Sequence, residues 1–106
     1  MAYNSFEEVY RLSVEKEREI LKYGDCVEKI WAAWSIGLKL GKDAVPDLIA
    51  CLYECPTPGT RRHIIVILAG FGQYDVVKEF AYNDPDEYVR LTAREYLERI
   101  KHWKQH

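Results

Sequence analysis

The sequence has no long apolar run and no marked excess of charge of either sign. Its run IIVIL at 64–68 has the length of a core element, far below the ~20 apolar residues that a membrane-spanning helix needs. The first segment, MAYNSFEEVYRL, is polar and acidic within its first ten residues, unlike a signal or transit peptide. We therefore expect a soluble, cytoplasmic protein with no membrane partner.

The near balance of charges narrows the classes of function. Lysine and arginine number 15, aspartate and glutamate number 17, and the formal net charge is −2. A general nucleic-acid binder should carry a strong basic excess. The composition therefore disfavours nucleic acid as the partner.

Cysteines are few and odd in number, which argues against a disulfide framework. Cys26, Cys51 and Cys55 are expected to be free thiols in a reducing compartment. Cys51 and Cys55 lie four residues apart on one expected helix, a poor geometry for a disulfide. The two thiols could bind a soft metal together with His63, but small buried core thiols are far more common.

Catalytic motifs are also missing. The chain has no GxSxG, no phosphate-binding loop and no pair of acids in a context that would tune them. His102 and His106 have the spacing of two metal ligands on a helix, but HWKQH lacks the glutamate and the third ligand of a zinc protease. We therefore expect no catalytic residue, no metal and no cofactor, and we predict that the protein is not an enzyme.

What the sequence does contain is helical periodicity along nearly its whole length. Its 106 residues, 48% of them hydrophobic, suit one domain with a real core. Ser5 with Glu8 and Asp25 with Glu28 have the spacing of capping boxes at the starts of two helices. The pattern predicts an all-α fold of about six helices, joined by short connections into antiparallel hairpins. The expected ranges are 5–22, 25–40, 44–54, 58–70, 74–82 and 86–104.

Further start and stop residues support these ranges. Asp43 is the expected cap of the third helix, and Thr57 is the expected cap of the fourth, with Pro58 as its first residue. Gly41 and Gly72 end the helices that precede them. These residues favour a helix over a buried strand for the IIVIL run.

The second expected helix is apolar on more than one side, which predicts burial on two sides. We expect Trp34 to pack in the core. For Trp31 and Trp103, core packing and an exposed platform for stacking bases are about equally favoured. The apolar residues of this helix are Val27, Ile30, Trp31, Ala33, Trp34 and Leu38.

The chain also repeats itself. CPTPGTRRHIIVIL at 55–68 aligns with DPDEYVRLTAREYL at 84–97, displaced by 29 positions, so that Arg61 matches Arg90. A second alignment, displaced by 31, brings Gly41 onto Gly72. A period near 30 with two helices per unit is typical of an α-solenoid.

The pattern Asp-Pro-Asp, Val-Arg, Ala and Leu in DPDEYVRLTAREYL resembles the HEAT repeat, especially the short bacterial HEAT-like repeats of the PBS-lyase type. The resemblance covers roughly residues 25–100 and implies a short right-handed α-solenoid with capping helices at both ends. It also implies that Arg61, Asp84 and Arg90 bridge successive repeats. The expected divisions are a capping helix at 1–24, repeats at 25–55 and 56–83, and a final half-repeat with its cap at 84–106.

The resemblance further implies that the second helix of each expected hairpin lines a concave partner surface. Acidic side chains interleaved with tyrosines suit a basic protein or peptide, although an ordinary solvated face has about equal weight. An immunity or antitoxin-type inhibitor is one specific version. The expected partner-binding residues are Asp47, Tyr53, Glu54, Asp75, Lys78, Glu79 and Tyr82.

Two other functions stay open as alternatives to this non-enzymatic interaction module. The last expected helix is locally basic, which would suit a HEAT-like nucleic-acid binder. A phycobilin lyase-like accessory role is the third alternative. The open ends of a solenoid also allow homodimers. The basic residues of the last helix are Arg90, Arg94, Arg99, Lys101 and Lys104.

Overall fold

The computed structural model describes residues 2–104, and within them all regular structure is helical. The predicted all-α fold class is confirmed. Across this range, no helix combines the length and the apolar character needed to cross a membrane. The helices are α1 Phe6–Tyr10, α2 Val14–Tyr23, α3 Cys26–Leu40, the 3-10 helix η1 Gly41–Ala44, α4 Val45–Glu54, α5 Pro58–Gly70, α6 Tyr74–Asn83 and α7 Glu87–Lys104.

The prediction of one continuous helix over 5–22 is wrong, because the chain breaks between α1 and α2. Ser13 caps α2, and its hydroxyl accepts a hydrogen bond from the Lys16 amide at 3.2 Å. Such a cap satisfies an amide that a new helix would otherwise leave without a partner. Lys39 of α3 fixes the break, since its ammonium donates to the Leu12 carbonyl at 2.7 Å and pairs with the buried Glu17 carboxylate.

The expected caps are only partly realised. Asp25 and Glu28 form the complete capping box at the start of α3. Ser5 caps α1, but the Glu8 carboxylate accepts from the Asn4 amide rather than from Ser5, so the predicted second box is incomplete. The prediction for Asp43 is wrong, because that residue lies within η1 and α4 follows without a side-chain cap.

The start of α5 shows the same partial agreement. Thr57 precedes the helix and Pro58 is its first residue, as predicted, but Thr57 makes no capping bond. Its hydroxyl lies 2.9 Å from the Cys26 thiol instead. The expected stops at Gly41 and Gly72 both have positive φ, 58° and 71°, a conformation that glycine adopts without strain.

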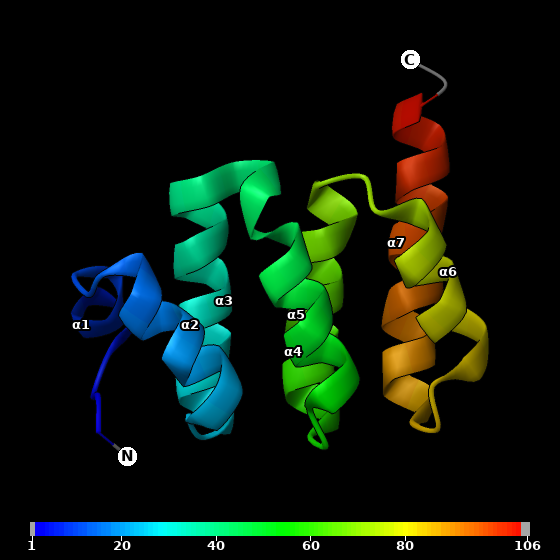
Figure 1. Cartoon of the computed structure of the whole chain (residues 1–106). Helices are drawn as coiled ribbons and strands as arrows, with labels where there is room; N and C mark the ends of the chain where they lie inside the picture. The colour runs from blue at the N-terminus through cyan, green and yellow to red at the C-terminus, as the bar shows by residue number, and fades with distance from the viewer. Residues whose placement is uncertain (1, 105–106) are drawn as a thin grey trace.

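The helices form two layers (Figure 1). In this view α2, α4 and α6 lie in front of α3, α5 and α7. The closest antiparallel pairs are α2 with α3, α4 with α5, and α6 with α7, whereas α3 meets α4 mainly through η1. The natural unit of packing is therefore displaced by one helix from the expected hairpins at 25–55 and 56–83. Within the second layer α5 packs along both α3 and α7, and the first layer is more loosely joined.

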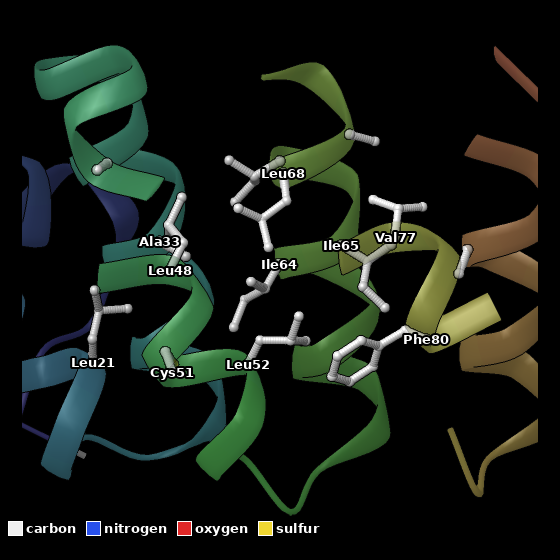
Figure 2. Packing of buried hydrophobic residues seen from close by; sticks show 14 of the residues in the cluster. Leu21, Ala33, Leu48, Cys51, Leu52, Ile64, Ile65, Leu68, Val77 and Phe80 are labelled. Carbon is white, nitrogen blue, oxygen red and sulfur yellow. The ribbon is translucent and has the colours of Figure 1, made fainter. Parts of the chain in front are cut away.

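The centre of the core lies around α5. Figure 2 shows Ile64 directed toward Leu52 of α4, while Ile65 points the other way, toward Val77 and Phe80 of α6. Ile64 and Ile65 are fully buried. Burial of one such side chain contributes roughly 1.5–3 kcal/mol to stability. The packing of both α4 and α6 therefore depends on α5, the fourth expected helix.

The predicted core position of Trp34 is wrong, although α3 does pack on two sides, against α1 and α2 and against α5. Trp34 is 37% exposed and Leu38 is 69% exposed. The core-facing side of α3 carries mostly small residues, and a Cβ added at Gly37 would lie 3.4 Å from Ile67 of α5. Because α3 and α5 approach this closely, an indole cannot fit between them. Trp31 is half-buried against the core, and Trp103 is 51% exposed.

Candidate partner-binding surfaces

The structure brings Arg61 and Asp84 together. The Arg61 guanidinium donates from Nε and Nη2 to the two Asp84 carboxylate oxygens at 2.9 and 3.0 Å, and from Nη1 to the Cys55 carbonyl at 3.0 Å. Both charged residues are buried. This two-pronged pairing is the strongest form of an arginine–carboxylate contact, and it ties the turn before α5 to the turn before α7.

Arg90 repeats half of this arrangement. Its Nη1 donates to the Asp84 carbonyl at 2.7 Å, six residues back, just as Nη1 of Arg61 donates to Cys55 six residues back. No carboxylate pairs with Arg90 within the described residues. Asp84 therefore holds two arginines at once, one through its side chain and one through its backbone.

The predicted acidic face on α4 and α6 is divided by internal contacts. Asp47 pairs with Arg18 of α2 at 3.0 Å. The Tyr53 hydroxyl donates to the Glu79 carboxylate, and this hydrogen bond, with lesser effects of burial and of the Glu79 charge, raises the pKa of Tyr53. Glu54 lines a small recess shared with Arg18 and Lys22.

The α6 part of this face is similarly engaged. The Lys78 ammonium lies 6.0 Å from the centre of the Tyr74 ring, and the Arg94 guanidinium lies 5.7 Å from the Tyr82 ring. Asp75 is exposed at the start of α6. The seven expected residues thus form several local groups with cations among them, rather than one continuous acidic patch.

A different surface carries an apolar recess of about 460 Å³. It lies between α3 and α7, with α5 as its floor. No charged residue lines it within the described part of the chain. A Cβ added at Gly70 would meet nothing within 4 Å, so this glycine leaves the floor open. The walls and floor include Trp34, Leu38, Val66, Gly70, Tyr96 and Trp103.

A second recess of about 300 Å³ adjoins it along α5, since Val66 lines both, and its lining includes the polar side chains of Arg62, His63 and Thr92. Here Nε of Arg62 donates to the Thr92 hydroxyl at 2.9 Å. The Trp34 indole donates to Nδ1 of His63 at 3.3 Å, which leaves the proton of the neutral ring on Nε2. We call the two recesses together the α5 groove, with an apolar end at Trp34 and Trp103 and a polar end at Arg62 and His63.

The thiol and histidine alternatives for a metal site are separated in space. Cys51 and Cys55 are buried, whereas His63 is exposed in the α5 groove. Burial, with a smaller contribution from Cys55, raises the pKa of Cys51 to about 11, so its thiol stays protonated and weakly nucleophilic at neutral pH. Among the described residues no group of three or more His, Cys, Asp or Glu could hold a metal ion. His106 lies outside the described residues.

The basic residues of α7 are largely engaged within the molecule. Nε of Arg94 donates to the Ala81 carbonyl at 3.1 Å, and Arg99 pairs with Glu95 at 2.9 Å. Lys101 pairs with Glu98 at 3.4 Å. These three cations of α7 therefore already have partners within the molecule. Comparison of the chain with family models, with curated proteins and with solved structures gave no match.

Proposed function

We propose that the chain is a non-enzymatic protein-interaction module that binds a partner in the α5 groove. The supporting observation is that large apolar side chains stay exposed around one recess that no charged residue lines within the described part of the chain, with Leu38 at 69% and Trp103 at 51% exposure. Removal of such apolar surface from water by a partner would be favourable by roughly 25 cal/mol per Å². Concentrated patches with tryptophan anchors mark protein-binding sites.

The proposal includes a short right-handed α-solenoid of the HEAT-like type as the scaffold. The matching contacts of Arg61 and Arg90, displaced by 29 positions, support it. With units of α2–α3, α4–α5 and α6–α7, the second helix of each unit borders the α5 groove. The closer packing of that layer suits the inner side of a curved stack. Cytoplasmic localisation stays a prediction.

The α4–α6 face is a second candidate surface, for a basic partner such as a toxin bound by an immunity-type inhibitor. Tyr53 is 54% exposed beside the Glu79 carboxylate, and Tyr82 is 60% exposed. A recess of about 310 Å³ lies between Tyr53, Glu79 and Phe80. Because Asp47 already pairs with Arg18, the charge-reversal test of this face is better made at Glu54, Asp75 and Glu79.

Partner capture from the source lysate by four forms of the chain tests the proposal. Leu38→Glu places a charge in the α5 groove, and Leu91→Glu is its control, since Leu91 is 50% exposed and outside the groove lining. The fourth form is a Lys triple variant at Glu54, Asp75 and Glu79. We expect a stoichiometric partner that is lost only with Leu38→Glu, while circular dichroism shows every form folded.

If the triple variant loses the partner and Leu38→Glu does not, the partner binds the α4–α6 face and not the α5 groove. A protein that captures nothing stoichiometrically, or that captures only nucleic acid, would contradict the interaction module on both faces. These outcomes separate the two candidate surfaces whatever the identity of the partner.

A further inference from the structure

We propose that the occupant of the α5 groove is an amphipathic helix of the partner protein with acidic residues toward one end. Its apolar side chains fill the apolar end of the groove, and its carboxylates meet Arg62 and His63. This inference rests on the proposed function and specifies the chemistry of the partner.

The spacing of the apolar anchors suits a helical ligand. On α7, Tyr96 and Trp103 are seven residues apart, about 10.5 Å along the helix. On α3, Trp34 and Leu38 are one turn apart and line the same recess. A ligand helix that lies over α5 would therefore present apolar residues one and two turns apart, the i, i+4, i+7 pattern of helices that bind in grooves.

The backbone of the groove also favours a helix over an extended strand. An extended ligand gains affinity by hydrogen bonding to an exposed sheet edge, and residues 2–104 contain no strand. The walls are helices, whose amides and carbonyls bond within each helix. A ligand in this apolar recess must therefore satisfy its own backbone groups, as a helix does.

The polar end lacks the charge that would complement it. Arg62 lines the polar recess, no carboxylate does so within the described residues, and its only hydrogen bond there is to Thr92. That bond through Nε orients the guanidinium and leaves both Nη groups for a ligand. His63 adds a second donor at Nε2, because Nδ1 is occupied by Trp34. Two oriented donors that line the same recess suit a carboxylate.

The length of α5 sets the register of the ligand. The helix has 13 residues, so its axis is about 20 Å long. His63 and Gly70, at the polar and apolar ends, are seven residues apart, or about 10.5 Å. A ligand of three to four turns thus places its acidic residues about two turns from its central apolar anchor.

The test uses fluorescence anisotropy with the full chain and three helix-stabilised peptides of 14 residues. Each carries leucines at i, i+4 and i+7, and two residues near one end are Glu, Gln or Lys. We expect the Glu peptide to bind about tenfold more tightly than the Gln peptide, and the Lys peptide to bind most weakly. Arg62→Glu should reverse this order, while Lys16→Glu, a charge reversal at an exposed position of α2 outside the groove lining, should leave it unchanged.

Equal affinity for all three peptides, still weakened by Leu38→Glu, would overturn the acidic specificity and leave the proposed function intact. An unchanged order in Arg62→Glu would also overturn it. No binding of any peptide, together with partner capture that is indifferent to Leu38→Glu, would remove the groove as the functional site. A homodimer in sedimentation that Leu38→Glu dissociates would instead identify a second copy as the occupant.

Discussion

Helices α5 and α7 carry matching sequence positions but meet different surroundings. Arg61 and Arg90 make the same hydrogen bond to a carbonyl six residues back, yet only Arg61 also has a carboxylate partner among the described residues. Displaced by the same 29 positions, fully buried Ile65 of α5 corresponds to exposed Arg94 of α7. The difference teaches that one helical pattern serves as core or as surface according to whether another helix packs over it.

A second pair of matching positions differs in the same way. Ala69 of α5 is fully buried, and its counterpart in α7 is the exposed Glu98. These two positions are therefore charged and exposed on α7 where they are apolar and buried on α5. Self-association on that side is disfavoured because two such surfaces would have to bury charged side chains.

The largest effect should come from removing the carboxylate that distinguishes the two arginines. Asp84→Ala leaves the buried Arg61 guanidinium unpaired, and we expect a loss of about 3–5 kcal/mol in the free energy of unfolding, measured by urea denaturation. Arg90→Ala, the control, removes one hydrogen bond of a half-buried side chain and should cost about 1 kcal/mol. Equal losses for the two variants would contradict the difference between the helices.

A smaller effect is expected when the arginine–aspartate pair that joins α5 to the turn before α7 is copied into the turn before α5. Cys55 is buried and corresponds to Asp84, while Ile30 stands where the preceding unit would need its arginine. Cys55→Asp buries an acid without that arginine, so we expect a loss of about 2 kcal/mol, again from urea denaturation.

Addition of Ile30→Arg should recover about 1 kcal/mol or more as a coupling energy in a double-mutant cycle. The single variant Ile30→Arg, which creates an arginine without its acid, completes the cycle. Additive effects of the two changes would show that the turn before α5 cannot accept the contact seen before α7.

The smallest effect on stability should come from making the outer side of α7 resemble α5. Arg94→Ile with Glu98→Ala changes two exposed positions, and we expect a change within about 1 kcal/mol, mainly from the lost Arg94 hydrogen bond. The new apolar surface should nevertheless promote association through that side, detected as a concentration-dependent sedimentation coefficient. A variant that stays monomeric at all concentrations would show that these two charges are not what keeps the outer side of α7 from associating.

Local signals predicted most of the helix boundaries. Asp25, Pro58, Gly41 and Gly72 act through neighbours in the chain, and the starts and ends that they predict agree with the structure. The break before Ser13 was missed because the carbonyl that it frees is bound by Lys39, a residue from another helix. A contact of this kind leaves no trace in the periodicity of 5–22.

The binding surfaces were harder to predict for a related reason. Periodicity shows that α3 has two apolar sides, but only the packing of α5 decides that Trp34 remains exposed. The sequence predicts that the expected residues of α4 and α6 face solvent, and most of them do. It does not predict the cations that partly neutralise their charge, such as Arg18, because these come from a neighbouring helix. The α5 groove has no counterpart in any single segment, since three helices form it together.

The double use of Asp84 bears on how the molecule opens. Because one residue holds Arg61 by its side chain and Arg90 by its carbonyl, the turn cannot come loose without releasing both arginines. Fluctuations of the last two helices should therefore extend into α5, and amide hydrogens of α5 and α7 should exchange with solvent in one cooperative step. We therefore expect α5, α6 and α7 to unfold as one unit that this single turn holds together.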